Sequence, residues 1–185
     1  MAWTTPKTNF ISGEVLTATQ MNSIGSNLVA LINAGSTTKT DKYSASVAGL
    51  SFTPNVTGLE VTITPSTVTS KILLVCSLSI ATETGSIVGA KLMRDVTAIA
   101  IGDAEGSRAR VSAAINTAVA TGGQTAIITT LDSPGTIAAI TYGVQLYNNS
   151  GLTRTLYLNQ GTDTTTNSGG YLRTVSSITA IEIPV

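Results

Sequence analysis

The sequence predicts a mainly β protein: an antiparallel two-sheet sandwich, with a jelly roll favoured, preceded by an extended arm and one short N-terminal α-helix. Short segments of alternating apolar and polar residues, about nine or ten of them, follow residue 43 without an intervening helical stretch. Turn residues separate them at intervals of roughly 8 to 15 residues. Hydrophobic residues make up 42% of the chain and charged residues only 11%. The surface must therefore be built largely from Ser, Thr, Asn and Gly, as in Thr-rich β proteins.

The length of 185 residues suits one well-buried domain with an appended segment. We expect three parts: an arm and helix over residues 1–33, a linker over 34–42, and a β-sandwich head over 43–185. The linker is predicted because residues 34–42 have almost no apolar content.

Residues 1–15 hold large apolar groups without helical or strand periodicity, which indicates an extended arm. Trp3, Pro6 and Phe10 need another surface to cover them, either a docking partner or the chain's own domain. The N-terminus lacks the charged-then-apolar layout of a signal peptide, so we expect no secretory export.

A helix is predicted to begin at Thr17, because Thr17 and Gln20 match a capping box. Four apolar residues follow at spacings of three, four and three: Met21, Ile24, Leu28 and Leu31. They form one narrow stripe on a helix that is too short to be stable alone, so the stripe must be buried. It can pack onto the β domain or form a self-associating bundle, and its narrow width favours the bundle.

Alternation is clearest at residues 72–80, 140–146 and 178–183. The same pattern recurs in six further segments: 59–64, 88–94, 98–101, 108–119, 125–131 and 155–159. Segment 72–80 begins apolar on both faces and is expected to be a central strand.

The chain contains no histidine, which removes the commonest general base and the commonest transition-metal ligand. We therefore expect no enzyme activity, no cofactor and no metal site. A polysaccharide-degrading enzyme remains as an alternative, because a glycosidase needs only two carboxylates. The candidates all lie in or beside turns, where Asp is also a structural residue: Asp95, Asp103, Glu105, Asp132 and Asp163.

Ten basic residues balance ten acidic ones, so the chain offers no field to attract nucleic acid or anionic lipid. We expect neither nucleic-acid binding nor membrane insertion. Aromatic and amide residues gather in two late turn regions and are typical of sugar-binding loops, although simple turn residues have the same composition. These candidate surface-binding residues are Tyr147, Asn148, Asn149, Asp163 and Tyr171.

Two sets of residues resemble phage proteins. Residues 2–6 (Ala-Trp-Thr-Thr-Pro), 12–18 (Ser-Gly-Glu-Val-Leu-Thr-Ala) and 21–22 (Met-Asn) are similar to the N-terminal segment of many phage tail and virion proteins, especially of aquatic phages. Residues 58–59, 63–66, 70–73, 92–94, 101–103, 131–134, 140–142 and 177–183 are similar to a β domain common in phage fibre-like proteins.

The resemblance implies a virion protein assembled in the bacterial host cytoplasm: a homotrimer with a jelly-roll head on an N-terminal virion anchor. Trp3, Pro6 and Phe10 would dock on other virion proteins, and the head would present loops to a host cell-surface glycan. Only the helix and a short linker separate anchor from head, which weakens a tail fibre relative to a baseplate or capsid accessory. A capsid decoration protein or head fibre of the same architecture is the alternative.

Overall fold

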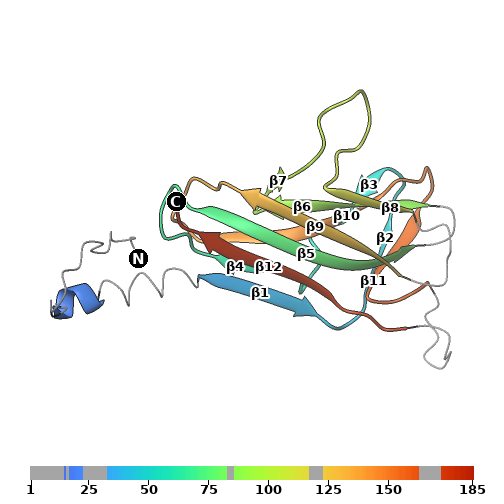
Figure 1. The fold of residues 1–185 in the computed structure, drawn as a ribbon. Coiled ribbons are helices and arrows are strands. Elements are labelled where there is room, and N and C mark those ends of the chain that lie inside the picture. Colours follow the sequence, from blue (N-terminus) through green and yellow to red (C-terminus); the bar gives the residue numbers. More distant parts are fainter. Residues whose placement is uncertain (1–14, 16, 23–32, 83–85, 117–122, 163–171) are drawn as a thin grey trace.

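The structure is a computed structural model that describes residues 15, 17–22, 33–82, 86–116, 123–162 and 172–185. Within these residues, twelve strands form two antiparallel sheets that pack face to face (Figure 1). One short helical segment, residues 18–22, precedes them. The predicted β-sandwich after a short N-terminal helix is therefore confirmed.

Sheet A is organised around its longest strand. Its members are β1 (Ala34–Lys39), β2 (Tyr43–Val47), β5 (Lys71–Thr82), β9 (Gln124–Asp132), β11 (Arg154–Leu158) and β12 (Ser176–Ile183). Strand β9 pairs along one side of β5, while β12 and β11 share its other side, one after the other. Strands β1 and β2 then pair with β12 and β11 and form the opposite edge.

Sheet B has the same plan around β10 and β6. Its members are β3 (Ser51–Phe52), β4 (Val61–Ile63), β6 (Ile87–Arg94), β7 (Thr97–Ile99), β8 (Ala113–Asn116) and β10 (Ile140–Asn148). Strand β10 pairs with β6 on one side and with β3 and β4 on the other. Strands β7 and β8 pair in line along the far side of β6.

Four pairs of these strands lie in line and act as single interrupted strands: β1 with β2, β3 with β4, β7 with β8, and β11 with β12. Joined in this way, the described strands become eight, ordered 1-8-3-6 in sheet A and 2-7-4-5 in sheet B. This is the strand order of a jelly roll, so that prediction is also confirmed.

The core lies between the sheets and follows the predicted alternation. In β5, Ile72, Leu74, Cys76, Leu78 and Ile80 all point inward and are fully buried. Burial raises the pKa of the Cys76 thiol to about 12, so this cysteine is an inert apolar residue of the core.

One ion pair joins the two sheets. The Arg94 guanidinium in β6 lies 3.0 Å from both carboxylate oxygens of Asp132 in β9. The hydroxyl of Tyr142, in β10, donates to the same carboxylate at 2.7 Å. Burial, and then this carboxylate, raises the pKa of Tyr142 far above its usual value. Asp132 is therefore a structural residue.

The predicted helix start is confirmed. The Thr17 amide donates to Oε1 of Gln20 at 2.7 Å, and the Gln20 amide donates back to the Thr17 hydroxyl at 3.2 Å. This is the reciprocal pairing of a capping box. Met21, the first residue of the predicted stripe, is 57% exposed. Ile24, Leu28 and Leu31 lie outside the described residues.

The predicted linker over residues 34–42 is wrong for most of its length. Residues 34–39 form β1, paired in register with β12 from Ala34 opposite Ile181 to Lys39 opposite Ser176. Its inward residues are small or polar because β1 lies close over the edge of sheet B. A Cβ on Gly35 would lie 2.8 Å from a methyl of Val61, and the Thr37 hydroxyl donates to the Glu60 carbonyl at 2.7 Å.

A buried carboxylate fastens the start of β1. Glu182, 2% exposed, accepts hydrogen bonds from the amide and hydroxyl of Ser66, both at 2.6 Å, and from the Asn33 side chain. Burial alone raises the pKa of Glu182, but the hydrogen bonds from Ser66, Ser70 and Asn33 outweigh it and hold that pKa below its ordinary value.

Among the described residues, no helix has the length and apolar character needed to cross a membrane.

Candidate functional site

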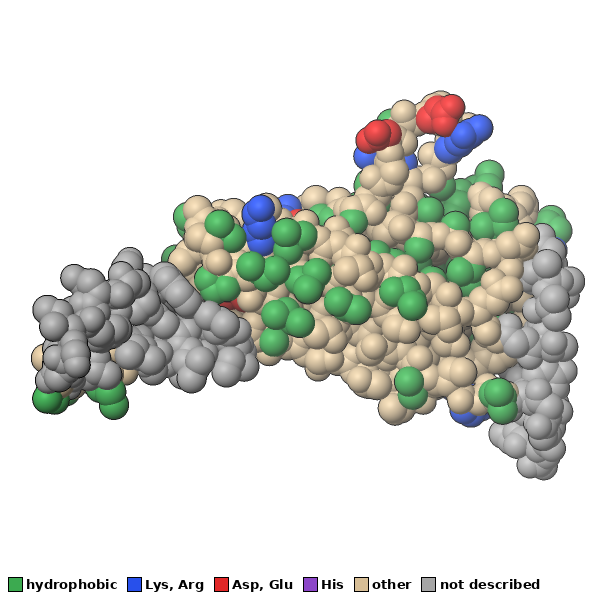
Figure 2. Space-filling model, in the orientation of Figure 1, with side chains coloured by type: hydrophobic (Ala, Val, Ile, Leu, Met, Phe, Trp, Pro, Cys, Tyr) green, Lys and Arg blue, Asp and Glu red, His purple; other side chains and the backbone are tan. Residues whose placement is uncertain are grey.

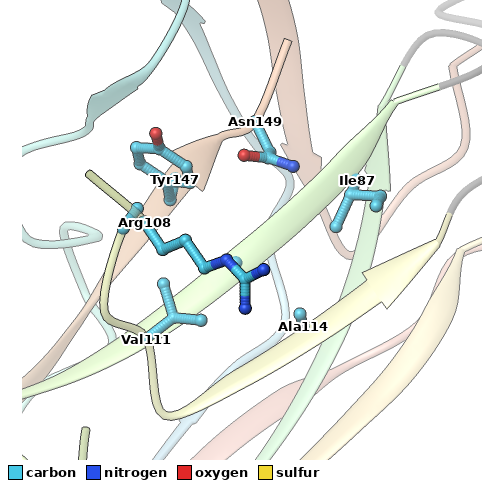
Figure 3. Close-up of a pocket in the computed structure, with 8 residues that line it drawn as sticks. Ile87, Arg108, Val111, Ala114, Tyr147 and Asn149 are labelled. Atoms are coloured by element: carbon cyan, nitrogen blue, oxygen red, sulfur yellow. The ribbon is translucent and has the colours of Figure 1, made fainter. Parts of the chain in front are cut away.

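A hollow of about 400 Å³ opens on the outer face of sheet B, the face that points away from the core. Four segments line it: the start of β6, the loop over residues 100–112, the strand β8 and the end of β10 (Figure 3). The side chains labelled there are Ile87, Arg108, Val111, Ala114, Tyr147 and Asn149. The loop between β7 and β8, together with β8, thus supplies one wall, and the end of β10 supplies the other.

The floor of the hollow depends on Gly89. In the sheet register, Gly89 lies between Tyr147 of β10 and Ala114 of β8. A Cβ at this position would lie 2.6 Å from a methyl of Val111 and 3.2 Å from the Cβ of Tyr147. Glycine is therefore required for the loop to approach the sheet this closely.

The aromatic side of the hollow is held rigidly. The Tyr147 ring packs on Phe52 with ring centroids 4.6 Å apart, and the Lys91 ammonium lies 3.6 Å from the centre of the Phe52 ring. Burial lowers the pKa of Lys91. This stack leaves Tyr147 only 7% exposed. Tyr147 therefore lines the hollow but exposes little of its ring to a ligand.

The loop over residues 100–112 rises above the sandwich between β7 and β8 (Figure 1), and charged side chains gather on it in Figure 2. Arg108 lies 2.8 Å from a carboxylate oxygen of Glu105, and both side chains are more than 70% exposed. Such an exposed pair contributes little to stability, about 0–1 kcal/mol. The guanidinium keeps further N–H groups that can donate to an anionic ligand.

Two hydrogen-bonded residues hold the base of this loop. The Arg110 side chain donates to the Gly102 carbonyl at 2.6 Å. The Ser112 hydroxyl donates to the Ile99 carbonyl at 3.2 Å and accepts from the Leu92 amide at 2.9 Å. These hydrogen bonds fix both ends of the loop that contains Arg108 against the sandwich.

Only part of the predicted surface-binding set lies at this hollow. Asn149 is exposed at the rim, where its backbone N–H donates to the Ile87 carbonyl at 3.2 Å. Tyr147 lines the hollow but is almost buried, contrary to the prediction of an exposed aromatic residue. Asp163 and Tyr171, like Trp3, Pro6 and Phe10 of the arm, lie outside the described residues.

Asn148 is wrong as a surface-binding residue. It is fully buried, and its side-chain amide donates to the carbonyls of Val47 and Leu152 at 2.9 Å each. Its side-chain oxygen accepts from the Ser150 amide at 3.0 Å. All these groups belong to the backbone of its own chain, so Asn148 holds the turns together and has no capacity left for a ligand.

Sequence reasoning did not assign Arg108 to a binding site, because the alternation over 108–119 indicated a strand. Strand β8 in fact begins only at Ala113. Two glycines, Gly102 and Gly106, and the charged Glu105 and Arg108 lie close together in the sequence. This spacing is a loop signal that would have distinguished the loop around Arg108 from the strand that follows it.

The chemistry of the hollow suits binding. Ile87 and Val111 provide an aliphatic wall, while Asn149 and Arg108 provide an amide and a guanidinium. A ligand with an apolar face and hydroxyl or carboxylate groups fits this set. Three of the carboxylates considered for catalysis have partners within the chain: Asp132 bonds Arg94, Asp95 accepts from the Thr141 amide, and Glu105 pairs with Arg108.

Within the described part of the chain, no group of three or more His, Cys, Asp or Glu residues could hold a metal ion. The sequence matches no protein-family model, and a search of curated proteins returned no match.

Proposed function

We propose that this chain is a non-enzymatic phage virion structural protein, a short trimeric tail fibre or baseplate-attached fibre whose jelly-roll head binds the host surface. The observation that carries the proposal is the arrangement of its parts. A capped helical segment with an exposed apolar Met21 precedes a jelly-roll domain in the chain. A short helix of this kind needs partners for its apolar stripe, and two further copies of the chain would supply them.

Each part has its own task in this proposal. Trp3, Pro6 and Phe10 dock on other virion proteins, and the stripe that begins at Met21 joins three chains. The hollow of the head binds a surface glycan, with Arg108 at a carboxylate. Each copy offers few contacts, but three copies at fixed separation raise avidity by about 10² to 10⁴.

The trimer is tested by light scattering of the full chain at micromolar concentration. The expected mass is that of three chains of 18.9 kDa each. Ile24→Asp would place three charges in the seam and is expected to lower the mass to one chain. Ser23→Asp, on the polar side of the predicted helix, is the matched control and should leave the mass unchanged. A wild-type mass of one chain would refute the proposal.

Binding is tested by competition with phage adsorption to host cells. Arg108→Ala and Asn149→Ala are expected to reduce competition while leaving the mass and melting temperature unchanged. Lys42→Ala removes an exposed charge in the turn between β1 and β2 and serves as the control. Equal competition by all variants would remove the hollow from the proposal. Gold-labelled chains found on capsids instead of tails would assign the protein to the decoration alternative.

A further inference from the structure

The outer face of sheet A carries a contiguous apolar patch, seen in Figure 2 as hydrophobic side chains gathered over β5, β9 and β12. The sheet register places four of its residues in one row across four strands: Ala34 opposite Ile181, Ile181 opposite Leu73, and Leu73 opposite Leu131. Three neighbours on the same face extend it: Val75, Ile127 and Ile183. We call these seven residues the sheet A patch.

The chain covers one half of this outer face and leaves most of the patch exposed, while Leu73 and Ile181 are half-buried. Ser79 and Ala81, at the far end of β5, are 4% and 1% exposed, and the Thr174 hydroxyl donates to Ser79 at 2.7 Å. On the neighbouring strand β9, by contrast, the side chain of Ile127 is 69% exposed and that of Leu131 is 48% exposed. A contiguous bare apolar surface on an otherwise well-packed domain marks an interface.

The chemistry around the patch favours a second copy of the same surface. Among the outward residues of β1, β5, β9 and β12, the single charged side chain is Lys71, at the margin. Apart from the apolar residues, the others are Ser and Thr, such as Ser36 and Thr179, whose hydroxyl groups share a hydrogen bond of 2.8 Å. Copies of this face can therefore meet without burying unpaired charges, and an anionic partner such as nucleic acid or a lipid surface would find nothing to bind.

The position of the patch points to the same partner. Its row begins at Ala34, and the preceding residue, Asn33, is fastened to the head: its side chain donates to the Thr64 carbonyl at 2.8 Å, and its carbonyl accepts from the Glu182 amide at 2.9 Å. A helical seam that gathers three chains therefore also gathers three copies of this edge, and it raises the effective concentration of one patch for another.

We infer that the sheet A patch is the surface through which the heads of neighbouring copies pack together. The inference rests on the trimer proposed above, for which it supplies the contact between heads. The hollow of sheet B lies on the opposite outer face of the sandwich, so the packed heads keep it accessible.

Thiol cross-linking of the full chain tests the contact directly. Thr129→Cys places a thiol on exposed β9 between Ile127 and Leu131, and Ser107→Cys places one on the exposed loop of sheet B. The native Cys76 is fully buried and will not react. With a short bismaleimide, Thr129→Cys should give covalent pairs of chains, and Ser107→Cys should give none.

A double variant tests how much the sheet A patch contributes to the affinity between the chains of the trimer. Ile127→Lys with Leu131→Lys is expected to raise the dissociation constant of the trimer at least about tenfold, because three patches would then carry like charges. Val96→Lys, on a 91% exposed side chain of the turn between β6 and β7, is the control and should leave the dissociation constant unchanged. A dissociation constant that is equal in all three proteins would overturn the inference.

The outcomes separate the inference from the proposed function. A trimer in which Thr129→Cys does not cross-link overturns the packing of the heads and leaves the helical seam intact. A wild-type mass of one chain without cross-linking overturns both. Cross-linking that survives Ile24→Asp supports the sheet A patch and removes the seam.

Discussion

Replacing Asn159 is expected to destabilise the head more than its single side chain suggests. Asn159 is fully buried at the end of β11, where β11 and β12 are interrupted. Its side-chain amide donates to the carbonyls of Lys39 and Asp41 at 2.8 and 3.0 Å, and its side-chain oxygen accepts from the Ser176 hydroxyl at 2.6 Å. It therefore links the break between β11 and β12 to the facing break between β1 and β2.

The magnitude follows from these three bonds and from the backbone. Asn159→Ala removes all three hydrogen bonds, each with a net contribution of about 1 kcal/mol. The residue also has a φ of +62°, which asparagine tolerates and alanine does not, at a further cost of about 1 kcal/mol. The expected loss is about 4 kcal/mol for Asn159→Ala and about 3 kcal/mol for Asn159→Gly, which is free of the backbone strain.

Thermal unfolding followed by circular dichroism measures both contributions, the lost hydrogen bonds and the backbone strain. A domain of this size loses roughly 2 to 4 °C per kcal/mol, so Asn159→Ala should lower the melting temperature by about 8 to 16 °C. Asn159→Gly should melt a few degrees above the alanine variant. Asn116→Ala, on the exposed side of β8, is the control and should shift melting by less than about 2 °C. Wild-type melting of Asn159→Ala, or a glycine variant less stable than the alanine one, would refute the reasoning.

Three further predictions concern stability and the hollow. Since the folded pKa of Glu182 lies below its unfolded value of 4.5, its stabilisation is complete above about pH 5.5 and is lost as the pH falls below 4.5 and through the folded pKa; the melting temperature should therefore fall less on acidification for Glu182→Gln than for wild type. Tyr142→Phe removes one donor from the buried side of Asp132 and should cost about 1 to 3 kcal/mol by urea unfolding. Gly89→Val would drive a side chain against Val111, so competition with phage adsorption should fall to the level of Arg108→Ala, and undiminished competition would contradict the position of the site.

The central strands could be predicted because their pattern is a direct consequence of burial. Segment 72–80 alternates so strongly that it identifies β5, and the final segment likewise identifies β12. Both strands bury alternate residues against the opposite sheet, so the two-residue period is visible in the sequence. The composite order of the strands followed only from the structure, since turn lengths do not reveal which strands pair.

Edge strands and buried polar residues could not be predicted in this way. Strand β1 turns Gly35, Thr37 and Lys39 inward, and none of these residues carries an apolar signal. Lys39 is 6% exposed and pairs with the exposed Asp41 at 2.8 Å. Asn148 looked like a turn residue, but it is the last residue of β10, and two of its partners, the carbonyls of Val47 and Ala48, lie about 100 residues away in the sequence. Local composition cannot show such partners.

The breaks in the strands explain why a chain so rich in Ser and Thr makes a stable jelly roll. Where β7 and β8 are interrupted, the Ser112 hydroxyl accepts from the Leu92 amide, which the missing strand would otherwise bond. Thr53 does the same for the Leu146 amide at 2.9 Å, and Ser176 for the Ser79 amide at 3.0 Å. A buried amide without a partner is costly, so each hydroxyl allows a strand to leave the sheet and return. One of these excursions carries Arg108 to the hollow, and the jelly roll thereby gains a loop at the proposed binding site without losing the pairing of its central strands.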